Sequence, residues 1–259
     1  VYVFNRGPHP MMIFDRDGNF QRAWGEGLYP RAHGIHMAPD GSIFLTDDGD
    51  HSVRQVTREG KVLLTLGTPG KSAKFMSGEP FHRCTHTALA PNGDIYVVQG
   101  HGKADSNVLK FDKDGNFIKA WGKKGNGPSE FEAPHSLAFD SKGRLFVADR
   151  GNNRIQIFSK DGAFIREMPV MRESTGPGVT GSTVFWPDKG QTYWFTSDDP
   201  NGQIHVLRRS DGVVVGSFGR VGRGPGEFEN LHNIAIDSKG NIYTAEVQGQ
   251  RVQPWPVWL

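Results

Sequence analysis

An internal repeat is the feature that most constrains how this chain folds. The repeat is clearest at residues 133–168, where four short runs rich in β-branched and aromatic residues alternate with turn sequences. Such a pattern predicts a four-stranded antiparallel meander. The second run recurs along the chain in six versions, VYVFN, IFLTD, IYVVQ, LFVAD, YWFTS and IYTAE. Four strands repeating every 40–50 residues or so are typical of propeller blades, so the repeat predicts six blades.

A glycine turn marks the hairpin between the third and fourth strands of these units. Its members pair an acidic residue with glycine: Asp17-Gly18, Glu59-Gly60, Asp114-Gly115, Asp161-Gly162 and Asp211-Gly212. Glycine is favoured there because a tight hairpin requires a positive φ. We therefore predict an all-β fold, a six-bladed β-propeller of four-stranded antiparallel blades, with residues 1–259 as a single domain. A solenoid of the same period is the alternative, but closure into a propeller removes the open sheet edges that four strands per unit would leave.

The first unit begins at its second strand, VYVFN, and the last unit ends soon after RVQPW. We expect that the missing innermost strand lies upstream of Val1, or that the two termini share a closing blade.

Composition excludes several classes of partner. The chain carries 30 Lys+Arg and 28 Asp+Glu, a formal net charge of +2, with the basic residues scattered rather than clustered. Neither nucleic acid nor a membrane surface is therefore indicated, and no apolar run is long enough for a membrane helix. The one cysteine, Cys84, has no internal disulfide partner and is expected to be a small buried hydrophobe. We expect a monomer, and the compartment, cytoplasmic or exported, is left open.

Histidine recurs at one register position. The turns between the first and second strands begin at residues 39, 91, 141, 187 and 238. Six residues before each turn stand, in order, His33, Thr85, His135, Gly181 and His232. Because these positions open the innermost strands, a histidine is expected at the same mouth of the channel in every second blade.

Three imidazoles around one axis suit a divalent metal such as Zn²⁺, with positions left open for water or substrate. The alternative for each histidine is that it caps a loop or bonds a neighbouring carbonyl. Equivalent placement in alternate blades favours a shared metal for His33, His135 and His232, either Zn²⁺ or another divalent transition metal.

The loops between the second and third strands share that face of the propeller. They carry the polar residues Arg6, His9, Asp47, Asp48, His101, Arg150, Asp198 and Glu246. Two guanidinium groups beside a metal suit a ligand that bears a carboxylate. The three aspartates are more typical of turns than of acids or ligands. Arg150 also fits a structural role, because DRGNNRI, which includes Arg154, is the ordinary loop of such a repeat.

The near-identical links AWGKKGNGPSEFEAPH and SFGRVGRGPGEFENLH, with the strand pattern, resemble the NHL-repeat signature across nearly the whole chain. At the site residues the chain looks like the peptidyl-α-hydroxyglycine α-amidating lyases, most closely from APHSLAFD through ADRGNNRIQIF. The resemblance implies that AHGI at His33, PHSL at His135 and LHNI at His232 bind zinc. It also implies that Arg6, in NRGPH, and Arg150 hold the substrate carboxylate.

The chain departs from that family at two places. The family's proposed catalytic tyrosine corresponds to His101, so His101 is expected to act as the base. Tyr29, in the link before His33, is the alternative, and a different substrate is another. The family's structural calcium takes backbone oxygens, which the resemblance places at Ile35 and Asn233, with a further ligand upstream of this sequence. Asn233 replaces an aspartate there, which weakens the expectation of calcium.

The leading functional prediction is a metal-dependent lyase that cleaves the C–N bond of a small carbinolamide or related α-hydroxy acid. A hydrolase that delivers metal-activated water to a lactone or amide at the same site is one alternative. A non-catalytic NHL module that binds protein or RNA is another. Fold alone does not separate them, and the sequence does not identify the substrate.

Overall fold

The computed structural model describes residues 1–74, 81–101, 106–172, 174 and 178–255. The chain forms two compact units, Val1–Lys124 and Gly125–Leu259. Regular structure in the described ranges is β-strand apart from one turn of 3-10 helix, η1 (Arg150–Asn152).

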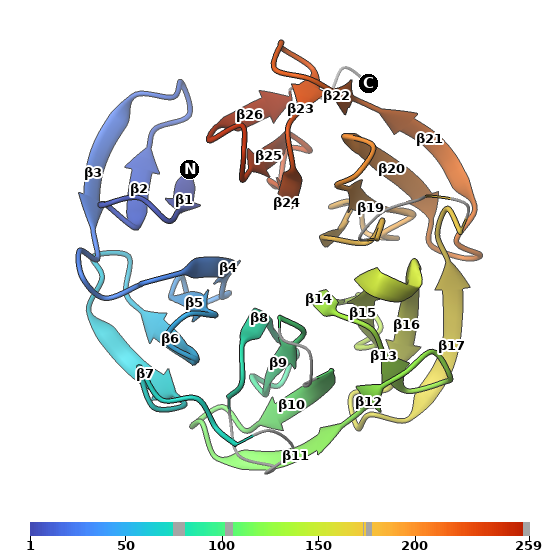
Figure 1. Ribbon diagram of the computed structural model, residues 1–259, viewed down its shortest axis with the longest axis horizontal. Helices are drawn as coiled ribbons and strands as arrows, with labels where there is room; N and C mark the ends of the chain where they lie inside the picture. Colours follow the sequence, from blue (N-terminus) through green and yellow to red (C-terminus); the bar gives the residue numbers. More distant parts are fainter. Residues whose placement is uncertain (75–80, 102–105, 173, 175–177, 256–259) are drawn as a thin grey trace. The chain divides into compact units, whose positions relative to one another are not determined.

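The first unit contains three antiparallel sheets, in which the strands lie side by side in chain order (Figure 1). They are β1 (Tyr2–Phe4), β2 (Met11–Phe14) and β3 (Phe20–Trp24); β4 (Ala32–Met37), β5 (Ile43–Asp47), β6 (Ser52–Val56) and β7 (Val62–Leu66); and β8 (Cys84–Leu89), β9 (Ile95–Gln99), β10 (Asn107–Phe111) and β11 (Phe117–Trp121). The short strand β12 (Lys123–Lys124) ends the unit.

The second unit repeats this plan. Its sheets are β14 (Pro134–Phe139), β15 (Leu145–Asp149), β16 (Arg154–Phe158) and β17 (Phe164–Pro169); β18 (Thr183–Phe185), β19 (Tyr193–Asp198), β20 (Gln203–Arg208) and β21 (Val214–Phe218); and β24 (Leu231–Ile236), β25 (Ile242–Glu246) and β26 (Val252–Trp255). Three two-residue strands, β13 (Glu130–Phe131), β22 (Arg220–Val221) and β23 (Glu227–Phe228), lie in the links, and β22 pairs with β23 in parallel.

These six meanders are the six blades that the repeat predicts, so the all-β, six-bladed propeller class is confirmed. In the described residues the first blade, β1–β3, and the last, β24–β26, have three strands each, and the other four blades have four.

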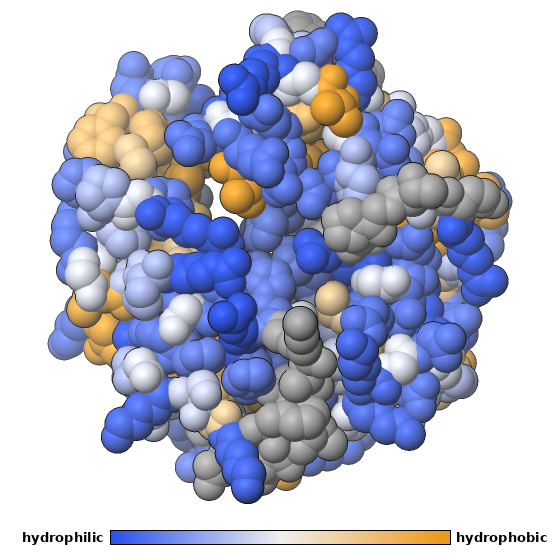
Figure 2. All heavy atoms as spheres, viewed as in Figure 1, coloured by the Kyte–Doolittle hydropathy of each residue, from blue (hydrophilic) through white to orange (hydrophobic). Residues whose placement is uncertain are grey.

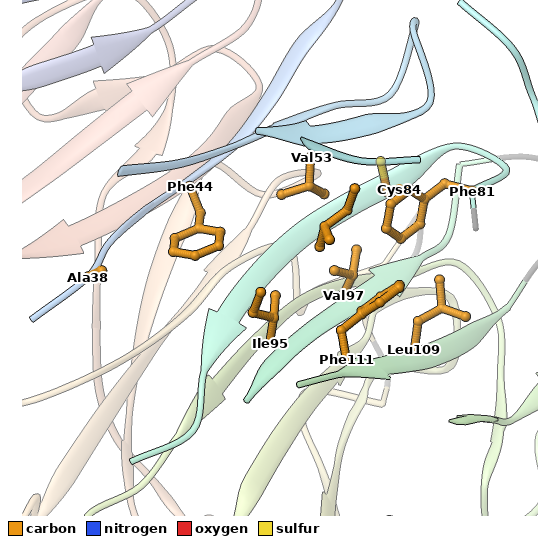
Figure 3. Packing of buried hydrophobic residues seen from close by; sticks show 10 residues of the cluster. Ala38, Phe44, Val53, Phe81, Cys84, Ile95, Val97, Leu109 and Phe111 are labelled. Carbon is orange, nitrogen blue, oxygen red and sulfur yellow. The ribbon is translucent and has the colours of Figure 1, made fainter. Parts of the chain in front are cut away.

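Burial within a blade explains the sequence pattern. All five residues of β5, β9 and β15 are buried, and each strand accordingly begins with an uninterrupted apolar run. The fourth strands β7 and β11 are mostly exposed. In the first unit, Phe44 packs in one cluster with Ile95 and Phe111 from the neighbouring blade (Figure 3). Cys84 belongs to that cluster with 0% exposure, and burial raises its pKa, so the predicted role of a small buried hydrophobe is confirmed.

The glycine turns have the predicted backbone conformation. Gly60 has a φ of 92° and Gly115 a φ of 87°. The sequence did not reveal the residue that stabilises these turns. At Gly115 the Asp112 carboxylate accepts hydrogen bonds from the amides of Asp114 (3.0 Å) and Asn116 (2.8 Å), an Asx turn that begins two residues before the Asp-Gly pair.

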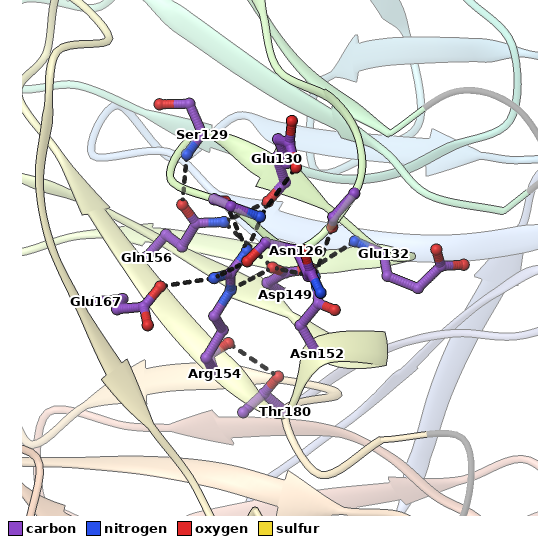
Figure 4. Close-up of polar contacts among 12 residues, drawn as sticks. Asn126, Ser129, Glu130, Glu132, Asp149, Asn152, Arg154, Gln156, Glu167 and Thr180 are labelled. Atoms are coloured by element: carbon purple, nitrogen blue, oxygen red, sulfur yellow. Dashed lines mark hydrogen bonds and ion pairs between the residues drawn. The ribbon is translucent and has the colours of Figure 1, made fainter.

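A buried polar network fixes the loop that follows β15 (Figure 4). Arg154 is 5% exposed and donates through Nε to Asp149 Oδ2 (2.7 Å). It also bonds the carbonyls of Asn126, Gly127 and Glu130 in the link before β14. Arg154 is therefore structural, as expected, and it ties the loop that carries Arg150 to the link that leads to His135.

The face in Figure 2 is mostly hydrophilic, and its hydrophobic residues form separate small areas. Within the described part of the chain, no helix has the length and apolar character needed to cross a membrane.

Candidate functional site

The three predicted metal ligands are all bulge residues. In β4 and β5, Ala32 pairs with Asp47 and Gly34 pairs with Thr46, which leaves His33 as the extra residue. The same register shift leaves out His135 between β14 and β15 and His232 between β24 and β25. A β-bulge bends the strand and redirects one side chain. The register derived from the turn spacing therefore corresponds to one repeated backbone feature.

His33 lies in the first unit with its imidazole orientation fixed. The residue is 7% exposed, and its Nδ1 lies 2.6 Å from the carbonyl oxygen of Thr85. Because a carbonyl only accepts hydrogen bonds, Nδ1 must carry the proton and the lone pair belongs to Nε2. In metal sites, a carbonyl bonded to the other ring nitrogen orients a ligating histidine in the same way.

His135 repeats this arrangement in the second unit. It is 3% exposed, and its Nδ1 lies 2.7 Å from the carbonyl oxygen of Gly181. Its ring centroid is 4.8 Å from that of the half-buried His232, at an interplanar angle of 78°. The candidate ligand atoms of these two histidines lie within 4.8 Å of each other. Imidazole nitrogens at this spacing could hold a metal ion.

The residues at the alternate register positions orient two of the histidines. Thr85 and Gly181 occupy the non-histidine positions, and their backbone carbonyls accept from His33 and His135. Each of these two histidines is thus oriented by the equivalent residue of the following blade. The spacing identified Thr85 and Gly181 by position, but their role as acceptors required the structure.

His101 lies beside His33 in the first unit. The two ring centroids are 4.3 Å apart, at an interplanar angle of 87°. His101 Nδ1 lies 2.6 Å from Asp48 Oδ2, and the Asp48 carboxylate also pairs with Arg31. The structure thus brings His101, one of the two predicted candidates for the base, next to a predicted metal ligand.

Tyr29, the other candidate, has a different environment. It is 5% exposed and packs in an apolar cluster with Met11 and Ile43. Its hydroxyl is buried and has no hydrogen-bond partner among the described residues. Burial raises the pKa of Tyr29 to about 12, against the smaller opposing effect of Arg54. A tyrosine hydroxyl in these surroundings resists ionisation.

Arg6 is exposed in the first unit and is tied to the strand of His33. Its Nε donates to the carbonyl of Ala32 at 3.0 Å, the residue before His33. Burial of part of the side chain lowers the pKa of Arg6, and the charge of Arg31 lowers it further. The charges of Asp48 and Asp47 oppose this shift, so the guanidinium lies among charges of both signs.

Arg150 opens η1 directly after β15, whose last residue, Asp149, pairs with Pro134 next to His135. The buried Nε of Arg150 has no hydrogen-bond partner among the described residues. Burial lowers the pKa of Arg150, and the negative charge of Asp199 partly offsets that shift. Burial likewise raises the pKa of Asp199, and the positive charge of Arg150 partly offsets it. A half-buried guanidinium with an unused donor is suited to binding an anion.

The acidic loop residues divide into two groups. Asp47 accepts hydrogen bonds from the amides of Arg31, Gly49 and Asp50, so it is a turn former as predicted. Asp198 accepts from the amide and side chain of Asn201. Asp48 differs from this prediction, because its contacts are with the charged side chain of Arg31 and with His101.

The predicted calcium ligands have ordinary protein contacts. Asn233 Oδ1 accepts from Ser182 Oγ and from the amide of Ile234, both at 2.9 Å, so this oxygen already has two donors. Ile35 packs against the apolar cluster around Met11 and Ile43. A calcium ion at these residues would depend on their backbone oxygens.

Comparisons with known proteins agree with the blade structure. Residues 89–168 match a family described as a 6-bladed beta-propeller. NHL repeat-containing protein 3 of Homo sapiens is 31% identical over 267 residues, which cover 98% of this chain and 75% of that protein. The probable peptidyl-alpha-hydroxyglycine alpha-amidating lyase of Caenorhabditis elegans is 28% identical, over 93% of this chain and 68% of that protein.

Solved structures extend the likeness in fold. A streptogramin B lyase has a TM-score of 0.65 with this chain at 13% sequence identity, covering 100% of this chain and 79% of that one. A virginiamycin B lyase from Staphylococcus aureus has a TM-score of 0.63 at 13% identity, covering 100% of this chain and 80% of that one. At this level of identity the likeness concerns the fold alone.

Proposed function

Because the chain belongs to the NHL-repeat family of NHL repeat-containing protein 3, we propose that it is a metal-dependent lyase built on that propeller. Its substrate would be a small carbinolamide or related α-hydroxy acid, whose C–N bond it cleaves. The observation that carries the proposal is the pair of buried histidines, His33 and His135, whose Nδ1 atoms are both held by backbone carbonyls. The similarity to peptidyl-hydroxyglycine lyases supports the choice of reaction.

We assign His33, His135 and His232 as ligands of one divalent ion, with zinc as the first candidate. Three neutral nitrogen ligands with open positions are typical of catalytic rather than structural zinc sites. When bound, the ion would supply Lewis acidity to the substrate hydroxyl.

The residues of the chain would perform the remaining steps. Arg6 and Arg150 would bind the substrate carboxylate and orient the hydroxyl. His101 would take the hydroxyl proton at Nε2, because Asp48 already engages Nδ1. The carbonyl double bond then forms as the C–N bond breaks, and the amide nitrogen regains a proton. The products are an aldehyde, such as glyoxylate, and a free amide.

A non-catalytic binding module is the second candidate, because NHL repeat-containing protein 3 is named for its repeats alone. A hydrolase at the same site is the third. Product analysis with an N-acyl-α-hydroxyglycine, which keeps its free carboxylate, separates the three functions. A lyase releases the carbonyl compound without consuming water, a hydrolase consumes water, and a binding module leaves the compound unchanged.

Metal analysis of the purified protein tests the site itself. We expect near-stoichiometric zinc or another transition metal in the parent, and its loss in both His33→Ala and His135→Ala. Equal trace metal in parent and variants would reject the site.

His205→Gln is the matched control for removal of a buried histidine. His205 is 0% exposed and bonds Asp198 and Ser217 within its own blade. Glutamine stands at the equivalent place in the fourth and sixth blades, where Gln156 and Gln253 donate to Asp149 and Glu246. The control should therefore fold and keep its metal.

A further inference from the structure

The loop after β5 contains a buried carboxylate whose contacts exceed what a turn requires. The Asp48 side chain is 0% exposed. Its Oδ2 lies 2.6 Å from His101 Nδ1, across 53 residues of sequence, and it pairs with the guanidinium of Arg31. The preceding residue, Asp47, already accepts the backbone amides of this turn.

We infer that Asp48 is a positioning residue that fixes the tautomer and the ring orientation of His101. This inference rests on the proposed function, in which His101 is the base. A carboxylate accepts only an N–H, so contact with Asp48 places the His101 proton on Nδ1 and the lone pair on Nε2. The imidazole is then held edge-on to His33, with the ring centroids 4.3 Å apart.

Arg31 supplies the charge compensation that a carboxylate in this position needs. Asp48 Oδ1 is buried and has no hydrogen-bond partner among the described residues, so Oδ2 alone carries both contacts. An isolated buried carboxylate would be costly, and Arg31, with 40% side-chain exposure, offsets that cost from the solvent side. His101 is 16% exposed, so the side of Asp48 toward His101 is the more enclosed one.

An ion pair with Arg31 alone does not account for this geometry. An exposed guanidinium can pair with a carboxylate at the surface, where the desolvation cost is small. Burial of Asp48 against an imidazole is instead the arrangement in which a carboxylate orients a histidine base. The position of Asp48 in its blade supports this role. Asp48 follows Asp47, which pairs with Ala32, the residue before His33. Arg150 follows Asp149, the partner of Pro134 beside His135.

The experiment compares the parent with Asp48→Asn by activity and by nuclear magnetic resonance. The amide keeps the shape of the side chain but can donate as well as accept, so the tautomer is no longer fixed. We expect kcat to fall roughly 100- to 10,000-fold, with KM and metal content within twofold of the parent. In the metal-free parent, ¹H–¹⁵N correlations should identify His101 as the Nδ1–H tautomer, and Asp48→Asn should shift it toward Nε2–H.

Asp198→Asn is the matched control, because Asp198 is a buried carboxylate that contacts a buried histidine, His205, at 3.0 Å. Its kcat should equal that of the parent. An equal fall in both variants would overturn the inference, as would an unchanged kcat and tautomer in Asp48→Asn or a loss of metal in that variant.

The resonance measurement separates this inference from the proposed function. If the parent cleaves no candidate substrate, the proposed function fails, while the tautomer of His101 still decides the role of Asp48. If Asp48→Asn does not fold, the parent alone is decisive. An Nε2–H tautomer of His101 in the parent would overturn the inference.

Discussion

Replacement of Arg154 by methionine tests how the second unit holds its site loops. The change removes five hydrogen bonds of 2.6–3.0 Å, to Asp149, Glu167 and the carbonyls of the link before β14. Both members of the central pair are buried, with side-chain exposures of 6% for Arg154 and 0% for Asp149. Removal of one partner from such a pair costs about 3–5 kcal/mol.

The lower end of that range applies to Arg154. Asp149 keeps three other donors, namely the Glu132 amide (2.7 Å), Asn152 Nδ2 (2.8 Å) and Gln156 Nε2 (3.1 Å). We therefore expect the free energy of unfolding to fall by about 3 kcal/mol, which with a urea slope of about 2 kcal/mol/M moves the midpoint down by about 1.5 M. Tryptophan fluorescence during urea unfolding measures this shift.

The pH dependence of the fall in unfolding free energy caused by Arg154→Met supplies a second check. Burial raises the pKa of Asp149, and hydrogen bonds from Asn152 and Arg154 oppose that rise. Without Arg154 the folded-state pKa rises further above the unfolded value. A carboxyl group with a raised pKa favours the folded state as pH falls below it, so the difference between variant and parent should be smaller at pH 5 than at pH 8.

Arg208→Met is the control, because Arg208 forms an exposed ion pair with Asp211 and its side chain is 47% exposed. Its urea midpoint should not change measurably. If the midpoints of Arg154→Met and Arg208→Met shift by the same amount, or if the loss at Arg154 grows on acidification, the reasoning from burial is refuted.

Three further substitutions test the site. Tyr29→Phe removes a buried hydroxyl that has no hydrogen-bond partner among the described residues, so the thermal midpoint should stay unchanged or rise slightly. The kcat of this variant should equal that of the parent, and a tenfold fall would indicate that Tyr29 is the base. Gly34→Ala places a Cβ 2.7 Å from the Thr85 carbonyl that orients His33, so metal content should fall. Gly216→Ala, with nothing within 4 Å of the added Cβ, should retain its metal. Equal metal in both variants would contradict a role of the Thr85 carbonyl in orienting His33. Arg150→Met should raise KM roughly 10- to 100-fold for a substrate with a carboxylate. The KM for the analogue in which that carboxylate is a neutral amide should not change. An equal rise for both compounds would show that Arg150 does not bind the carboxylate.

The sequence was sufficient for the blades and for the register of the histidines. Strand periodicity and glycine turns are local properties, and six copies of one pattern reinforce each other. Counting back from the turns located His33, His135 and His232 at equivalent positions, which the structure presents as three bulge residues. The bulge itself has no separate sequence signal in this chain.

The contacts that distinguish the loop residues required the tertiary structure. Asp47 and Asp48 are adjacent and chemically identical, yet one accepts the amides of its own turn and the other contacts His101, 53 residues away. The sequence offered His101 as the first candidate for the base and Tyr29 as the second, and the structure encloses Tyr29 in an apolar cluster and places His101 beside His33. A sequence pattern records the spacing of residues along a strand, whereas burial and side-chain direction depend on the neighbouring blade. The repeat therefore determined where polar residues collect, and packing between blades decided which of them meet.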